Sequence, residues 1–136
     1  MPAGTPALNV MDFTRLTLTE LRAVLRSGQT TSVAVTEALL ERIVAVDNLL
    51  NSYLTLTDEM ALIQAVEADE RRARGEETPL LGVPVAVKDM ICNEGVETSA
   101  GSKILEGFVP PYDAFVVARL KPVSYTHLTL PTKRIV

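Results

Sequence analysis

The sequence has little of what several protein classes require: one cysteine (Cys92), one histidine (His127), no tryptophan and 4% aromatic residues. A single cysteine excludes an internal disulfide framework of the kind that stabilises small secreted domains, so we expect a cytoplasmic protein. Because aromatic residues are few, any hydrophobic core must be mainly aliphatic.

A basic excess and a long apolar run are also missing. Thirteen lysines and arginines face seventeen acidic residues, for a net charge of −4, which argues against a surface that neutralises nucleic-acid phosphates. No run approaches the ~18 apolar residues of a membrane span. Residues 1–10 are rich in Pro, Gly and Ala without a cationic start, so we expect neither a signal peptide nor an anchor there.

What is present fits a soluble globular domain, or part of one, since 47% of the 136 residues are hydrophobic and 22% are charged. Thr17 and Glu20 have the spacing of a capping box, which predicts a helix that Gly28 ends. A second helix is predicted from Thr31 or Ser32, antiparallel to the first. Apolar residues spaced by three or four positions give each helix one buried face: Leu18, Leu21, Val24 and Leu25 in the first, and Val35, Leu39, Ile43 and Val46 in the second.

Further along, residues 53–57 alternate between apolar and polar strand formers and are predicted to form a strand. Residues 58–74 are rich in Ala and Glu, which predicts a helix that ends at Gly75. Residues 83–87 form a continuous apolar run, typical of a strand covered on both faces. Pro84 cannot donate to a ladder and should lie near the start of that strand.

Asp113 can cap a helix from residue 114 onward, with Val116, Val117 and Leu120 on its buried side. Pro122 interrupts that helix, and the pattern of residue types changes from there onward. Residues 123–132 resemble one reading frame of a transposase-type sequencing adapter.

The domain organisation follows from this change. We predict a flexible arm over residues 1–13, the N-terminal part of a domain over 14–121 and a non-native tail over 122–136, which we exclude from the fold. His127 lies in that tail and receives no catalytic or metal role. Without His127, the single cysteine cannot supply the set of Cys and His ligands that an ordinary zinc site requires.

One ionisable residue stands out at the end of the buried strand. Alternation places Val83, Val85 and Val87 on one face, and Pro84, Ala86 and Lys88 on the other. Small residues before Lys88 leave room for another element to pack above Ala86. An ammonium shielded in this way loses hydration, which favours the neutral amine that a general base requires. Taken alone, a Lys-Asp pair at a strand end is more often a solvated terminus than a catalytic site.

The segment Gly82-Val-Pro-Val-Ala-Val-Lys-Asp89 resembles the Gly-x-Pro-x-x-x-Lys-Asp segment of the amidase signature family. This resemblance implies an α/β fold in which N-terminal helices precede the first strands of a mixed sheet flanked by helices, here truncated. It covers roughly residues 14–121, through similar segments at 18–22, 51–57, 95–102, 108–114 and 117–120.

The resemblance also implies a mechanism. Amidases of this family use a nucleophilic serine, a second serine in a cis peptide that relays its proton, and a lysine that accepts it; Lys88 matches the lysine. Both serines belong to Gly/Ser-rich segments beyond the Asp113 helix, and this chain contains neither. Ser99 and Ser102 lie in an earlier loop and are interpreted as turn or cap residues. We therefore expect no amide hydrolysis by this chain, and a core strand whose sheet neighbours are not encoded.

Within the family, Pro110-Pro-Tyr-Asp-Ala114 is most similar to the A subunits of glutamyl-tRNA(Gln) and aspartyl-tRNA(Asn) amidotransferases. Such a subunit hydrolyses glutamine and passes the ammonia to its partners, the B and C subunits of a heterotrimer. ATP and Mg²⁺ are used by that complex to convert Glu-tRNA(Gln) to Gln-tRNA(Gln), with tRNA bound through the complex. No cofactor is expected on this segment itself.

Three alternatives remain open from the sequence. The first is another amidase signature hydrolase that acts on small carboxamides without tRNA. The second is a non-enzymatic helical interaction module over residues 14–75, in which Lys88 has no role. The third is a Cys92 thiolate nucleophile beside Lys88, although no histidine is present to orient it.

Overall fold

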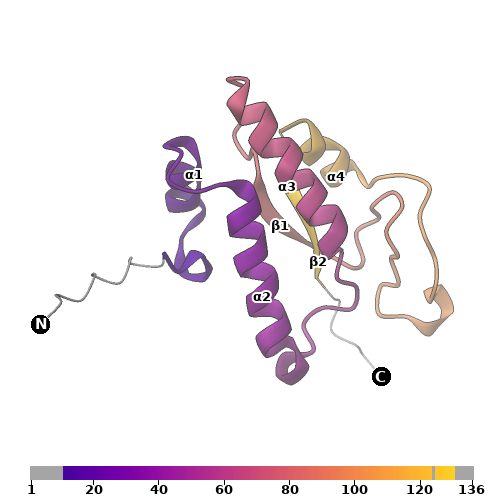
Figure 1. Cartoon of the computed structure of the whole chain (residues 1–136). Helices are drawn as coiled ribbons and strands as arrows, with labels where there is room; N and C mark the ends of the chain where they lie inside the picture. The colour runs from indigo at the N-terminus through magenta and orange to yellow at the C-terminus, as the bar shows by residue number, and fades with distance from the viewer. Residues whose placement is uncertain (1–10, 124, 131–136) are drawn as a thin grey trace, which may run out of the picture.

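The computed structural model describes residues 11–123 and 125–130 (Figure 1), so the predicted arm over 1–13 lies mostly outside the described residues. The elements are a 3₁₀ helix η1 (Phe13–Arg15), α1 (Leu18–Arg26), α2 (Ser32–Leu50), α3 (Asp58–Ala73), β1 (Val83–Lys88), η2 (Lys103–Leu105), α4 (Phe115–Leu120), η3 (Lys121–Val123) and β2 (Tyr125–Leu130). Across these residues, no helix combines the length and hydrophobicity needed to cross a bilayer.

Helix α1 begins at the predicted capping box. The Thr17 hydroxyl accepts from the Glu20 amide at 3.3 Å, and the Glu20 carboxylate accepts from the Thr17 amide at 2.7 Å. Leu21 and Leu25 are buried as expected, but Leu18 is exposed. Other apolar side chains, Phe13 and Leu16 among them, pack against the Leu21 and Leu25 cluster instead.

The capping box makes one pH-dependent contribution to stability. Hydrogen bonds from the Thr17 amide, and then from its hydroxyl, lower the pKa of Glu20 from its ordinary 4.5. A carboxyl whose pKa is lowered by folding stabilises the folded state above pH 4.5, and this contribution is lost as the pH falls through the folded-state pKa. We expect the free energy of unfolding, measured in urea, to fall less below pH 4.5 in Glu20→Gln, which does not titrate. Identical pH profiles for the two proteins would refute this assignment.

Helix α2 starts at Ser32 with Thr31 as its N-cap, as predicted. The helix that runs alongside α2 is α3 (Figure 1), so the predicted antiparallel pairing of the first two helices is wrong. Small side chains explain the difference, because α3 presents a row of alanines that lets the two helices approach closely. The buried residues of that row are Ala61, Ala65 and Ala68.

The strand predicted over residues 53–57 is not present; the backbone there is irregular. Asn51 takes a left-handed conformation with φ of 50° and ends α2. The Asp47 carboxylate then accepts from the amides of Ser52 at 2.6 Å and Tyr53 at 3.3 Å. Strand propensity alone does not make these residues a strand, because no described strand lies beside the segment to share backbone hydrogen bonds with it.

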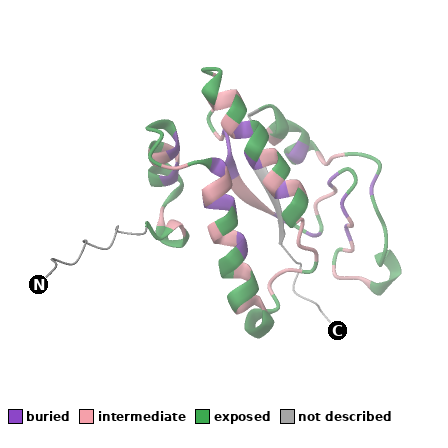
Figure 2. Cartoon of the chain, viewed as in Figure 1, coloured by how far each residue is buried: buried purple, intermediate pink, exposed green. Residues whose placement is uncertain are grey.

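Strand β1 lies between two helical layers. On its Ala86 face, α2 and α3 supply a cluster around Leu40 and Ala61. On its Val85 and Val87 face, α4 supplies Val117, which is completely buried. Figure 2 shows buried residues along β1 and on the helix faces beside it. The predicted alternation of faces is confirmed, as is the α/β class, and Pro84 is the second residue of the strand.

Strand β2 pairs with β1 in parallel, with Val83 opposite Tyr125 and Lys88 opposite Leu130. It lies within residues 122–136, the segment that we excluded from the fold as a non-native tail. That boundary stays a prediction, but the expectation that β1 has no encoded neighbour is wrong. The physical reason is that the segment consists of strand-forming residues and β1 offers an edge of unpaired backbone groups. The adapter origin of the tail stays a prediction.

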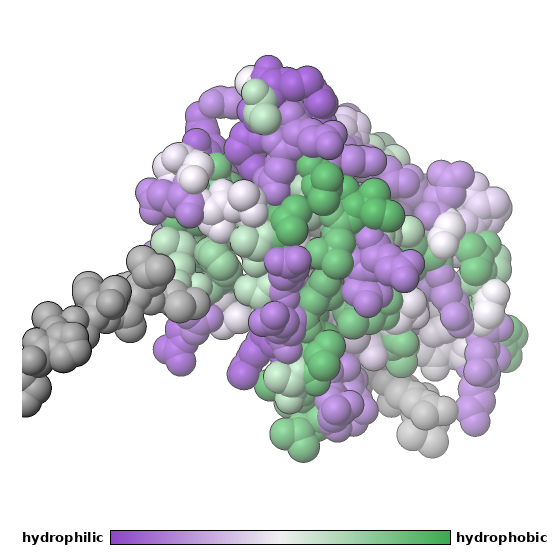
Figure 3. All heavy atoms as spheres, viewed as in Figure 1, coloured by the Kyte–Doolittle hydropathy of each residue, from purple (hydrophilic) through white to green (hydrophobic). Residues whose placement is uncertain are grey.

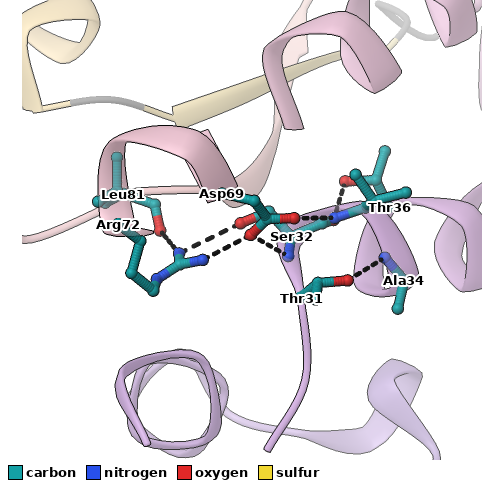
Figure 4. Close-up of polar contacts among 8 residues, drawn as sticks. Thr31, Ser32, Ala34, Thr36, Asp69, Arg72 and Leu81 are labelled. Atoms are coloured by element: carbon teal, nitrogen blue, oxygen red, sulfur yellow. Dashed lines mark hydrogen bonds and ion pairs between the residues drawn. The ribbon is translucent and has the colours of Figure 1, made fainter. Parts of the chain in front are cut away.

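A polar network joins α2, α3 and the segment before β1 (Figure 4). The Asp69 carboxylate accepts from the amides of Ser32 at 2.8 Å and Val33 at 3.1 Å, at the positive end of the α2 dipole. Arg72 donates to Asp69 at 2.6 Å, to the Ser32 hydroxyl at 3.2 Å and to the Leu81 carbonyl at 2.8 Å. Three separate segments are thereby held together just ahead of β1.

Gly82 lies where this network meets β1. Its φ is +72°, and a Cβ at this position would lie 1.8 Å from the Ser32 hydroxyl oxygen and 3.0 Å from the Arg72 guanidinium. Only glycine fits such a close approach in this conformation. The glycine that opens the segment 82–89 is therefore required for packing.

The outer surface of the α2 and α3 pair carries several exposed apolar side chains among charged ones. Figure 3 shows hydrophobic residues gathered along these helices on the face in view. Val44, Ile63 and Val66 are exposed on this pair, and Leu49 and Leu50 are exposed at the end of α2. Exposed apolar side chains that gather in this way are typical of a face that packs against further protein.

Candidate functional site

Lys88 is the last residue of β1, and its side chain is exposed, whereas Val87 and Asp89 on either side are both 6% exposed. Among the described residues, its ammonium makes no hydrogen bond or ion pair. The expected shielding of this amine is therefore wrong for this chain. Elements that would cover the end of β1 do not occur among the described residues, so the Lys88 side chain stays exposed.

The room predicted above Ala86 is present. A cavity of about 380 Å³ lies between α2 and the Pro84 and Ala86 face of β1. Tyr53 also lines it, and burial, followed by the negative charge of Asp47, raises the pKa of the Tyr53 hydroxyl. The other lining residues are apolar and polar in equal number: Leu39, Ile43, Val46 and Leu50, with Thr14, Arg42, Asp47 and Ser52.

Asp89 anchors the loop that follows β1. Its carboxylate accepts from the Ser99 amide at 3.0 Å, the Ser99 hydroxyl at 2.7 Å and the Gly101 amide at 3.1 Å. The Asp89 carbonyl accepts from the Ala100 amide at 3.4 Å. Ala100 and Gly101 both have positive φ, at 51° and 69°. A buried carboxylate is tolerated here because it is well supplied with donors.

Ser99 and Ser102 are confirmed as turn and cap residues. The Ser99 hydroxyl donates to Asp89 and accepts from the Gly101 amide at 3.2 Å. The Ser102 hydroxyl accepts from the Ile104 amide at 3.3 Å and caps η2. Both hydroxyls therefore stabilise the loop itself, and among the described residues neither is bonded to Lys88.

Cys92 is half-buried, and its thiol donates to the Tyr112 hydroxyl at 3.7 Å. This interaction raises the pKa of Tyr112. The described structure gives Cys92 a phenol as its partner and not the Lys88 ammonium, so nothing in the geometry supports a reactive thiolate.

Asp113 does not cap α4, contrary to the prediction. Its carboxylate accepts from the Glu94 amide at 2.8 Å and forms an ion pair with Lys121, while Ala114 is the N-cap and supplies no side-chain bond. Val117 is buried as predicted, but Val116 is exposed. Asp113 thus closes the far end of the loop that Asp89 anchors.

Sequence reasoning missed Asp89 as an organising residue. Its donors, Ser99 and Gly101, lie ten and twelve positions further along the chain, so no local pattern of the sequence could identify it. No group of three or more His, Cys, Asp and Glu side chains within residues 11–123 and 125–130 is placed to hold a metal ion.

A sequence model of the family described as Amidase matches residues 34–127. This chain belongs to the amidase family. The match includes β1 and the Lys88-Asp89 pair, so the family resemblance inferred from residues 82–89 is confirmed.

The family members that this chain resembles include amidotransferase subunits. It is 55% identical over 105 residues to the A subunit of the glutamyl-tRNA(Gln) amidotransferase of Thioalkalivibrio sulfidiphilus, which covers 77% of this chain and 22% of that protein. It is 50% identical over 111 residues to the same subunit of a Geobacter species, covering 82% and 23%. This chain therefore spans a little over a fifth of the length of these relatives.

The fold of this amidase family member also has solved counterparts. The peptide amidase of Stenotrophomonas maltophilia superposes with a TM-score of 0.80 at 35% identity, over 86% of this chain and 24% of that one. The α/β fold expected from the resemblance is therefore confirmed for the part of the fold present in this chain.

Proposed function

We propose that this chain is the N-terminal part of a glutamine-hydrolysing amidotransferase subunit and that Lys88 is its catalytic base. The observation that carries the proposal is the position of Lys88: it ends β1 inside residues 82–89 of a chain 55% identical to the A subunit of a glutamyl-tRNA(Gln) amidotransferase. The exposed apolar residues of α2 and α3 and the unshielded Lys88 support a larger parent domain that covers them.

The chemistry assigned to the parent protein is amide hydrolysis: glutamine and water give glutamate and ammonia. A nucleophilic serine attacks the carboxamide carbon, a second serine relays the proton, and Lys88 accepts it. The ammonia leaves with a returned proton, and water then releases glutamate from the acyl-enzyme. Both serines, and the donors that stabilise the oxyanion, belong to the remainder of the parent protein.

The same proposal assigns partners and location. The names of the similar proteins, subunits of a glutamyl-tRNA(Gln) amidotransferase, support a complex with B and C subunits that passes the ammonia to Glu-tRNA(Gln). ATP and Mg²⁺ would be used by those partners, and no residue of this chain is assigned to bind them. Such a complex would act in the cytoplasm, where tRNA is charged.

The test uses a protein in which residues 1–121 are followed by the Thioalkalivibrio sulfidiphilus subunit beyond the position matching Lys121; we call it the joined protein. With the B and C subunits of that organism present, we expect the joined protein to release ammonia from glutamine. The 136-residue chain alone should release none, since it lacks the serines.

Release of ammonia by the short chain would overturn the proposal. Activity of the joined protein on small carboxamides, but not on glutamine, would instead support the second candidate, a hydrolase without tRNA. That candidate is favoured by the structural likeness to a peptide amidase. Activity that persists without Lys88 would support the interpretation of residues 14–75 as a binding module.

A further inference from the structure

We propose that Asp89 is a positioning residue that fixes the direction in which Lys88 leaves β1. This inference rests on the proposed function, because it assigns Asp89 a role in orienting the catalytic base. The observation behind it is the contrast between the two neighbours: Asp89 is 6% exposed and hydrogen-bonded through both carboxylate oxygens, whereas Lys88 is exposed and unbonded in the described structure.

The backbone that follows Lys88 couples the two side chains. β1 ends at Lys88, and Asp89 is the first residue of a turn in which the Lys88 carbonyl accepts from the Ile91 amide at 2.8 Å. The Asp89 carboxylate is held by Ser99 and Gly101, so the residue next to Lys88 is anchored to the following loop. The backbone on the C-terminal side of Lys88 is therefore fixed, and with it the direction in which the lysine side chain leaves the strand.

The choice of a carboxylate is specific. One oxygen of Asp89 accepts from the Ser99 amide, and the other accepts from the Ser99 hydroxyl and the Gly101 amide. Asparagine has nearly the same shape, but its NH₂ group would face a backbone N–H, whichever way the amide is turned. Asp89→Asn therefore removes at least one of the hydrogen bonds that anchor the loop to position 89.

A matched control exists at the far end of the same loop. Asp113 accepts from the Glu94 amide at 2.8 Å, a bond comparable to those of Asp89 but made to a different part of the loop. Asp113→Asn therefore perturbs the loop without touching the anchor of Lys88. Ser99→Ala provides a milder variant, since it removes one hydroxyl donor and leaves both amide bonds to Asp89 in place.

The experiment measures kcat and KM for glutamine in the joined protein with its B and C subunits, at a temperature where each variant is folded. We expect Asp89→Asn to lower kcat by about 100-fold, as for a misplaced catalytic group, with KM nearly unchanged. Ser99→Ala should lower kcat by about fivefold, and Asp113→Asn by less than about twofold. The pH profile of kcat should move in Asp89→Asn and stay in place in Asp113→Asn.

The outcomes separate this inference from the proposed function. If Asp89→Asn lowers only the melting temperature, with kcat and the pH profile unchanged, Asp89 is purely structural and the inference fails. If Asp89→Asn does not fold, Ser99→Ala decides: an unchanged kcat contradicts the inference and a lowered one supports it. If the joined protein remains active without Lys88, the proposed function itself fails.

Discussion

Replacing Gly82 with alanine is expected to lower the free energy of unfolding of this chain by about 3 kcal/mol. Two effects combine at this position. The backbone φ of +72° is unfavourable for any residue with a Cβ, and that Cβ would lie 1.8 Å from the Ser32 hydroxyl oxygen and 2.7 Å from the Ser32 Cβ. Ser32 is completely buried and cannot move aside easily, so the start of α2 or β1 must shift.

Gly75 provides a matched control, because its φ is +85° and no atom lies within 4 Å of the position that a Cβ would take there. Gly75→Ala therefore carries the conformational strain alone, about 1 kcal/mol. Urea denaturation followed by circular dichroism measures both variants. Equal losses of stability at the two glycines would show that the contact with Ser32 is not what requires glycine at position 82.

The elements that sequence alone predicted correctly have local causes. The start of α1 follows from the Thr17 and Glu20 pair, which satisfies backbone groups within four residues. Helix α3 ends within two residues of Gly75, close to the prediction, and β1 covers the predicted run 83–87. In each case the residues that determine the element lie inside it or next to it.

The errors have non-local causes. Residues 53–57 have strand propensity but no neighbouring strand in the described structure, and Asp47 binds the amides at their start. Asp113 contacts Glu94 and Lys121 in place of the helix it precedes. Pairing of β1 with residues 125–130 was unexpected, because strand pairing depends on an available edge as well as on pattern.

The candidate site shows the same division between features with local causes and features with non-local causes. The position of Lys88 at a strand end, and the face it occupies, followed from the alternation of residues 83–88. Its shielding did not follow, because an amine is desolvated only by elements that pack over it, and these do not occur among the described residues. The role of Asp89 depends on donors ten and twelve positions further along the chain, which no local pattern identifies.

Lys88→Ala in the joined protein is expected to lower the rate of glutamine hydrolysis by about 10³-fold, since it removes the proposed proton acceptor. Lys88→Arg should be equally inactive, because arginine keeps the positive charge but does not release its proton near neutral pH. Lys103→Ala, at an exposed lysine in the following loop, is the matched control and should leave the rate unchanged.

The most direct test of Lys88 as the base is therefore the release of ammonia from glutamine by the joined protein and by its Lys88→Ala and Lys88→Arg variants. We predict turnover in the joined protein and in Lys103→Ala, and its loss in both Lys88 variants. Turnover in Lys88→Arg close to that of the unaltered joined protein would show that a positive charge suffices, and would contradict the assignment of Lys88 as the base.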